Sequence, residues 1–62
     1  MSWHYQIKEF ENKGQKYYQM IEVYSGPYGT SGPITPVGET PSELIRDLEM
    51  MLNDARKYPV SP

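Results

Sequence analysis

The sequence predicts a small protein of the α+β class, in which a β-hairpin carries one C-terminal amphipathic helix on one face of its sheet. Two stretches rich in aromatic and β-branched residues flank the short link "NKG", and the last third of the chain repeats apolar residues at helical spacing. Hairpin and helix each have one apolar face, so we expect the helix to lie across the sheet. The chain forms a single domain with a hairpin over 2–25, a glycine- and proline-rich loop over 26–39, a helix over 41–57 and a tail over 58–62.

The segments "SWHYQIKEFE" and "QKYYQMIEVYS" are expected to be antiparallel strands joined by a three-residue turn. Gly14 closes that turn, because glycine adopts the left-handed backbone conformation without steric cost. The turn pairs Glu11 with Gln15 and thereby fixes the register of the hairpin. The predicted core face carries Trp3, Tyr5, Ile7, Ile21 and Val23. The predicted outer face carries His4, Gln6, Lys8, Phe10, Lys16, Tyr18, Met20, Glu22 and Tyr24.

The segment "ETPSELIRDLEMMLNDARK" has the signals of a helix with a defined start. Thr40 is the expected N-cap, Pro41 occupies the first helical position, and Glu43 stands where a capping box requires it. Met50 falls on the side opposite the apolar face and is expected to point to solvent, and Pro59 ends the helix. The apolar face, which we expect to be core, consists of Leu44, Ile45, Leu48, Met51, Leu52 and Ala55.

The loop "SGPYGTSGPITPVGE" has glycine at every third position over its first half, but too few triplets for a collagen helix. It has no lysine and does not open directly into a helix, which argues against a phosphate-binding loop. Two interpretations stay open: a plain connection, or a mobile contact loop that presents Tyr28. A brief third strand over 34–37 is a further alternative, restricted to a sheet edge by Pro33 and Pro36.

Composition excludes several classes of function. A net charge of −2 gives no support to binding of duplex DNA, whose affinity depends on phosphate neutralisation. No apolar run approaches the ~20 residues that cross a bilayer, and the N-terminus lacks a basic segment followed by an apolar one, so a cytoplasmic protein without membrane contact is expected. The chain has no cysteine to form disulfides or to bind zinc. Self-association or a partner is the remaining way to stabilise so small a core.

Catalytic and metal-binding patterns are missing from the sequence. His4 is the single histidine, and no cysteine is present, so a nucleophile beside a base is not recognisable. His4 lies opposite Glu22 in the predicted register, and we interpret this cross-strand pair as a structural contact. Glu43 and Asp47 fit a solvated acidic first turn better than a pair of catalytic carboxylates. We therefore expect no enzyme activity, no cofactor and no metal site.

The predicted outer face points to binding. Its aromatic and apolar side chains exceed what a monomer of this size normally exposes to water. A second copy or another protein is the expected cover, because tyrosine and methionine are suitable contact residues. The predicted partner-binding residues are Phe10, Tyr18, Met20, Tyr24, Tyr28 and Met50.

Three alternatives remain beside a protein-binding or regulatory module. The rings on the sheet, with Lys8 and Lys16 between them, also fit a platform that stacks single-stranded RNA. A compact inhibitor or antitoxin-type protein is a further alternative. In the plainest interpretation, the tyrosines lean across one another and stay partly exposed to water.

The chain resembles a group of small bacterial proteins that run "W-Y-R-V", "Y-x-I-x-E-V-Y", "G-E-T-x-E-E-L-x-x-D-L-E-x-M-L" and "P-V". The matching segments here are 3–7, 17–24, 38–52 and 59–60. This resemblance covers most of the chain and implies the order of two strands followed by a helix, without an activity. The step "G-x-T-x-x-E" also resembles that of HicB antitoxins, whose partial RNase H-like fold implies three strands before the helix.

Overall fold

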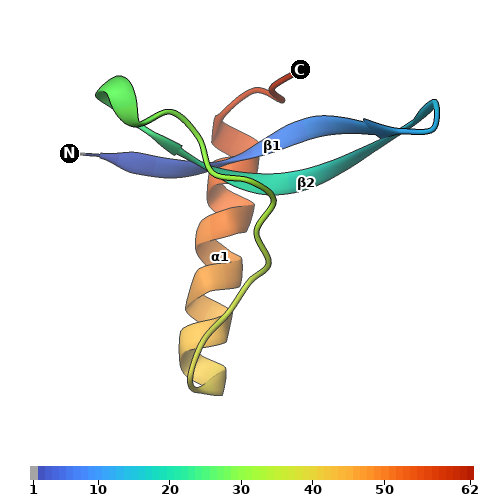
Figure 1. Ribbon diagram of the computed structural model, residues 1–62. Coiled ribbons are helices and arrows are strands. Elements are labelled where there is room, and N and C mark those ends of the chain that lie inside the picture. The colour runs from blue at the N-terminus through green and yellow to red at the C-terminus, as the bar shows by residue number, and fades with distance from the viewer. Residues whose placement is uncertain (1) are drawn as a thin grey trace.

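The computed structural model describes residues 2–62, apart from the side chain of Tyr28. The chain forms strand β1 (Trp3–Asn12), strand β2 (Gln15–Tyr24), a short 3-10 turn η1 (Gly26–Tyr28) and helix α1 (Pro41–Lys57). The helix stands away from the hairpin and meets it near its C-terminal end, beside β1 (Figure 1). The predicted α+β class, an antiparallel hairpin with one C-terminal helix packed on the sheet, is confirmed.

The turn between the strands has two residues, not three. Asn12 pairs with Gln15, which leaves Lys13 and Gly14 as the link. Both have positive φ, 52° at Lys13 and 81° at Gly14. Positive φ at both positions is typical of a type I′ turn, whose twist matches that of the two strands. The left-handed Gly14 is confirmed, but the predicted turn and the pairing of Glu11 with Gln15 are wrong by one residue.

This shift of one residue divides the expected core face between the two sides of the sheet. Trp3, Tyr5 and Ile7 face α1 as predicted, since the Tyr5 hydroxyl donates a hydrogen bond to Asp47 of the helix. Ile21 and Val23 were expected beside them and lie on the opposite face. The prediction of one apolar core face is therefore wrong.

The buried side chains reflect this division. On the helix side, Tyr5 and Met51 are each only 6% exposed. On the other side, Ile21 is 1% exposed. Among the side chains that the structure describes, these three are the buried apolar ones. The protein thus has two thin apolar layers on either side of a two-stranded sheet.

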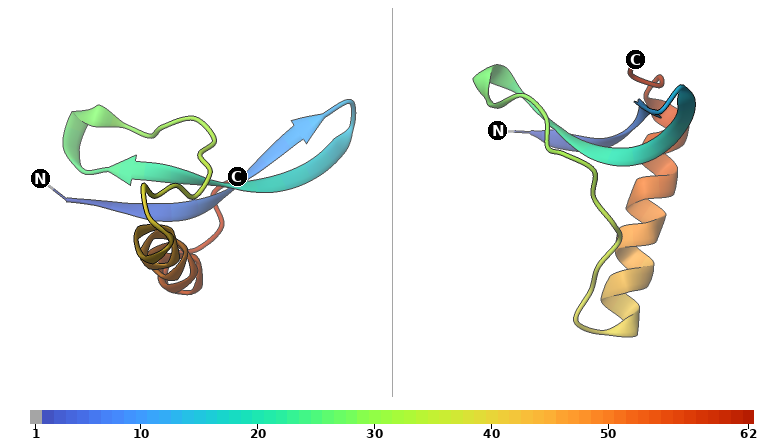
Figure 2. Two further views of the ribbon diagram at one scale, coloured as in Figure 1. Left: turned by 90° about the horizontal axis from the view of Figure 1, so that it is seen from below. Right: turned by 45° about the vertical axis from the view of Figure 1, so that its right-hand side comes forward.

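The C-terminal tail packs on this second side of the sheet. After α1 it rises past β1 to the side of the sheet away from the helix (Figure 2). There the ring of Tyr58 stacks on His4, with 3.6 Å between ring centroids. The side-chain amide of Gln6 donates to the carbonyl oxygen of Pro59 at 2.8 Å. The tail is therefore part of the fold and covers residues of β1.

Both edges of the hairpin base are paired. On the β1 edge, the amide of Ser61 donates to the carbonyl of Ile7 at 2.9 Å, and its carbonyl accepts from the amide of Glu9 at 2.8 Å. On the β2 edge, the loop runs alongside the strand and bridges Thr30 to Val23 and Ile34 to Met20. Edge pairing of this kind satisfies backbone groups that an open strand would expose. Within residues 2–62 these loop contacts stay isolated, and the alternative third strand over 34–37 does not form.

The predicted helix and its cap are confirmed. The hydroxyl of Thr40 accepts from the amide of Glu43 at 3.1 Å. The Glu43 carboxylate accepts from the amide of Glu39 at 2.9 Å, one residue before the position of an ideal capping box. The extended segment before the helix runs back along it (Figure 2). Gly38 approaches the helix so closely that a Cβ there would lie 2.3 Å from the amide nitrogen of Leu44.

Candidate protein-binding surface

Three large apolar side chains of α1 remain half exposed and form what we call the apolar stripe: Ile45, Leu48 and Leu52. Their exposed fractions are 54%, 45% and 49%. Spacings of three and four residues place them along one side of the helix. All three were predicted to be core, and that prediction is wrong. Of the predicted apolar face, only Met51 is buried, whereas Leu44 and Ala55 are partly buried.

The polar anchors of α1 explain this rotation of the helix. Asp47 accepts from the hydroxyl of Tyr5, and Asp54 accepts from the backbone amide of Tyr5 at 3.0 Å. At about 100° per residue, both carboxylates lie within about 60° of Met51 around the helix axis. We call this side, with Asp47, Met51 and Asp54, the anchored side of α1. The apolar stripe is centred about 90° further round, beyond the reach of the sheet.

The anchored side holds Tyr5 in its neutral form. Burial raises the pKa of the Tyr5 phenol, and the hydrogen bond to Asp47 raises it further, as do the charges of Asp47, Glu22 and Asp54. Asp47 also accepts from the amide of Val37 at 3.0 Å and so joins strand, helix and loop. Because the carboxylate of Asp47 accepts both hydrogen bonds, it holds β1, α1 and the loop together.

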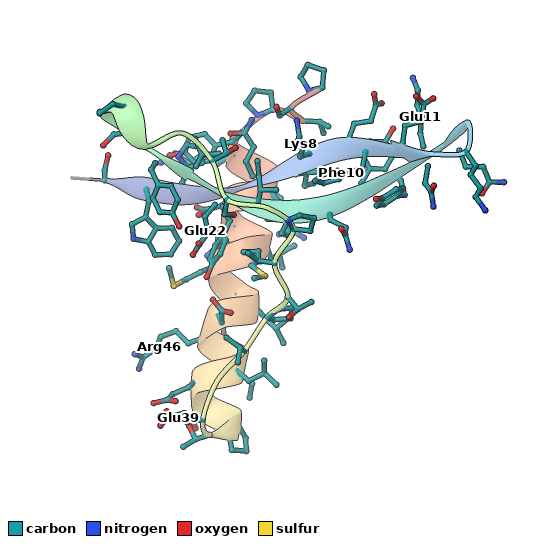
Figure 3. The ribbon with its side chains drawn as sticks, in the orientation of Figure 1. Lys8, Phe10, Glu11, Glu22, Glu39 and Arg46 are labelled. Carbon is teal, nitrogen blue, oxygen red and sulfur yellow. The ribbon has the colours of Figure 1, made fainter. Side chains whose placement is uncertain are left out.

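The apolar stripe lies on the side of α1 away from Arg46, and the end of the hairpin projects beyond the helix. We call that projecting end, residues 9–18, the hairpin arm; it extends to the right of the helix in Figure 1. Arg46 points to the left in Figure 3. Leu48 is separated from Arg46 by about 160° around the helix axis and therefore lies on the other side of α1. Beside the two strands, an open hollow of about 230 Å³ is lined by Ile7, Tyr18, Gln19 and Met20.

The predicted outer face does not exist as one surface. Phe10 lies on the face away from the helix, where its ring stacks on Tyr17 with 5.6 Å between centroids. Tyr18, Met20 and Tyr24 lie on the helix-side face. The one-residue shift in register separates them, because it moves every side chain of one strand to the other face. The expected combination of these aromatic residues on the outer face is therefore wrong.

The lysines expected to flank the rings are separated in the same way. The ammonium of Lys8 lies 5.8 Å from the centroid of Phe10 and donates to the main-chain oxygen of Pro62 at 3.0 Å. Lys16 lies on the opposite face, 3.7 Å from a carboxylate oxygen of Glu9. The two cations therefore do not border one stacking surface.

Two further predicted contact residues lie apart from the sheet. Met50 is exposed on α1, as predicted. The side chain of Tyr28, the residue expected to act at the tip of a contact loop, lies outside the part of the chain that the structure describes. The loop itself binds the β2 edge: the amide of Tyr24 donates to the carbonyl of Gly29 at 2.9 Å. This contact gives the loop a structural role besides connection.

His4 stands opposite Val23, and the expected pairing with Glu22 is wrong. Its Nε2 lies 3.0 Å from the side-chain oxygen of Gln6. Over residues 2–62, no three histidine or carboxylate side chains gather closely enough to hold a metal ion. No helix in that same range is long and apolar enough to cross a membrane.

Comparison with known protein families, with curated proteins and with solved structures found no match to this chain. We therefore identify the apolar stripe as a candidate binding surface from the geometry of this molecule alone. A signal for it is present in the sequence: the six predicted apolar positions span about 120° of the helix surface. A two-stranded sheet is only about 5 Å from strand to strand, and so narrow a surface cannot cover that whole face.

Proposed function

We propose that this protein is a non-enzymatic protein–protein interaction module that binds through the apolar stripe of α1. The supporting observation is that Ile45, Leu48 and Leu52 stay about half exposed along one side of α1. The whole chain also has a large accessible surface, 4854 Å². A compact monomer of 7.2 kDa is expected to expose about 4,100 Å². The excess is about 700 Å² for the whole chain, and the half-exposed side chains of the stripe are part of it.

The spacing of the stripe fits a recognised mode of binding. Ile45, Leu48 and Leu52 occupy positions i, i+3 and i+7, which are the anchor positions of helices that dock into apolar grooves or against other helices. Full burial of a leucine or isoleucine side chain contributes about 1.5–3 kcal/mol. Covering the remaining exposed half of three such residues therefore contributes on the order of 2–4 kcal/mol to association.

This proposal places the contact on the helix, away from the surface expected from the sequence. The RNA-stacking alternative needs cations beside a continuous row of rings, and Lys8 and Lys16 lie on opposite faces of the sheet. An inhibitor or antitoxin-type role would also act through protein contact, so it is one form of the same proposal. The identity of the partner then distinguishes the forms.

Affinity purification with matched variants tests the proposal. Leu48→Gln removes the centre of the stripe, whereas Arg46→Gln introduces the same side chain on the opposite side of α1. We expect wild type and Arg46→Gln to retain the same protein, which can be another protein or an untagged copy of this chain. Leu48→Gln should lose it. Circular dichroism verifies that both variants keep the helix.

Two results would contradict this function. Retention of identical proteins by all three baits would place binding elsewhere on the molecule. Retention of RNA in place of protein, with steep loss of binding as salt increases, would favour the stacking alternative.

A further inference from the structure

We propose that the hairpin arm joins two copies of this chain, which pair antiparallel along their β2 edges around a two-fold axis. The paired segment is 15–19, and Tyr17 of one copy meets Tyr17 of the other at the axis. The two hairpins then form one four-stranded sheet. This contact lies on the sheet, so it is independent of the apolar stripe and of the function proposed for the stripe.

The β2 edge carries backbone groups that the fold leaves open along the arm. In an antiparallel pair, every second residue directs its amide and carbonyl away from the neighbouring strand. At the base of the hairpin the loop takes these groups, and the amide of Ile34 donates to the carbonyl of Met20 at 3.0 Å. Tyr18 and Lys16 are the next outward residues in the same alternation. Among residues 2–62, no other segment forms a backbone hydrogen bond with these two. Such an edge is a template for another extended strand.

The open part of this edge is short and accessible. Ile34 occupies the position beside Met20, and the turn ends before Gln15. The open edge is therefore 15–19. The arm extends beyond the helix, the loop and the tail in Figure 1 and in the left view of Figure 2. A second strand thus reaches this edge without displacing another segment.

Charge and space select one register for two copies. Antiparallel pairing of Lys16 with Lys16 sets like charges directly opposite each other, which is unfavourable. Pairing of Lys16 with Met20 needs the place that Ile34 already occupies. Pairing of Lys16 with Tyr18 avoids both conflicts, uses only the open edge and places Tyr17 on the axis. Lys16 and Tyr18 then exchange both backbone hydrogen bonds on each side of the axis.

This register matches the side chains on both faces of the joined sheet. On the face away from α1, the rings of Phe10 and Tyr17 stack with 5.6 Å between centroids, and the row continues into the same two rings of the second copy. Aromatic pairs across neighbouring strands stabilise a sheet. On the helix-side face, Lys16 of one copy lies beside Tyr18 of the other. The two Lys16 ammonium groups are diagonal to each other, and each is balanced by a carboxylate oxygen of Glu9 3.7 Å away.

The exposure of the arm agrees with this partner. Tyr17 is 42% exposed and Tyr18 is 56% exposed, although both lie within a strand. Both rings are at the centre of the contact and are covered by it. A second copy is favoured over an unrelated strand because the same segment matches itself in backbone groups, in charge and in its row of rings.

Sedimentation equilibrium over a concentration series tests the inference with matched proline variants. Tyr18→Pro removes an outward amide of the β2 edge, whereas Glu11→Pro removes an outward amide of the β1 edge on the same arm. Proline is tolerated at edge positions whose amide faces solvent. We expect wild type and Glu11→Pro to approach twice the monomer mass of 7.2 kDa. Tyr18→Pro should dimerise at least about tenfold more weakly, because each lost donor acts twice in a two-fold contact. Tyr18→Ala keeps the amide and should dimerise more strongly than Tyr18→Pro, and circular dichroism measures the folding of every variant.

Amide hydrogen exchange tests the contact in the wild-type protein, without a substitution. The amides of Lys16 and Tyr18 should exchange at least about tenfold more slowly at a concentration where the dimer predominates than at one where the monomer does. The amide of Glu11 is the internal control, since it points outward from β1 and lies outside the contact. Exchange at Lys16 and Tyr18 that does not change as the protein dimerises would overturn the inference.

The outcomes separate this inference from the proposed function. Leu48→Gln should dimerise as wild type does, so an untagged copy held through the arm is retained by all baits, and only proteins that Leu48→Gln loses report on the stripe. A wild type that stays at the monomer mass at every concentration overturns the arm contact and leaves the stripe untouched. A dimer that Tyr18→Pro forms as well as wild type does would also overturn it. Growth beyond a dimer would contradict the two-fold contact, which closes after two copies.

Discussion

The anchored side of α1 and its apolar stripe lie on one helix and differ in how far the rest of the chain covers them. Met51 on the anchored side is buried beside two carboxylates that accept hydrogen bonds from Tyr5. Leu48 and Leu52 on the stripe are at least as apolar as Met51 and remain about half exposed. The orientation of this helix is therefore set by polar anchors, and hydrophobicity alone does not decide which residues are covered. A helix with a wide apolar face keeps the remainder free for a partner.

The largest expected difference between the two sides is seen on truncation. Met51→Ala should destabilise the isolated chain by about 2–5 kcal/mol, because it leaves a cavity in a core with few buried residues. Leu48→Ala should cost the dilute chain less than about 1 kcal/mol, since that side chain is half exposed. Urea unfolding at low protein concentration measures both. Equal losses would remove the distinction between the anchored side and the stripe.

The second expected effect concerns the anchor itself. Tyr5→Phe removes the hydroxyl that donates to Asp47 and should cost about 1.5–3 kcal/mol, the value of a hydrogen bond to a charged group. Because the pKa of Tyr5 is raised above its ordinary value of 10.0, the unfolded chain loses this proton before the folded chain does. The contribution is thus complete below pH 10 and is lost as the pH rises above it.

The pH dependence gives this prediction a control. The hydroxyl of Tyr24 donates to Glu22 at 2.5 Å, which raises its pKa at the surface of the molecule. Stability measured from pH 8 to pH 11 should fall most in wild type, less in Tyr24→Phe and least in Tyr5→Phe, because burial is the leading cause of the raised pKa at Tyr5 alone of the two. A fall of equal size in Tyr5→Phe would show that the anchor does not control alkaline stability.

Gly38 fixes the extended segment against the part of α1 that lies clear of the sheet. Gly38→Ala should destabilise the protein by about 1–3 kcal/mol, because the added Cβ collides with backbone atoms of Glu43 and Leu44. Gly32 is the matched control, since a Cβ there meets nothing within 4 Å. Thermal melts of both alanine variants compare the two positions. A Gly38→Ala variant as stable as Gly32→Ala would mean that the segment does not pack on the helix.

The smallest expected effect lies at the helix start. Thr40→Ala should cost about 1 kcal/mol through loss of the hydrogen bond from the amide of Glu43. This change acts on both sides of α1 equally, so the difference in free energy of unfolding between Met51→Ala and Leu48→Ala should be retained in its presence. Melting curves that overlay those of wild type would contradict the role of Thr40 as the cap.

Local signals in the sequence predicted the local features of the fold. The Thr40 cap, the left-handed Gly14 and the bounds of the helix depend on neighbouring residues, and all three are confirmed. The register of the hairpin was wrong because "NKG" is compatible with a three-residue and a two-residue turn. That choice depends on whether Lys13 adopts a positive φ, which its residue type disfavours.

The candidate site was less predictable, because it depends on contacts between distant segments. Periodicity identifies the apolar face of α1 but not its rotation, which the bonds from Tyr5 to Asp47 and Asp54 determine. These partners are more than forty residues apart in the chain. The stacking of Tyr58 on His4 likewise covers part of a face for which the sequence pattern predicted a binding partner.

The central claim is that the apolar stripe is covered when the protein associates, and capture of partners by matched variants tests it most directly. The protein retained by wild type should also be retained by Arg46→Gln, whereas Leu48→Gln should lose it, because that change removes the apolar anchor at the centre of the stripe. If the partner is a second copy, a tenfold increase in protein concentration should also raise the Tm of wild type by several degrees. Retention of the same protein by all three variants would contradict the claim.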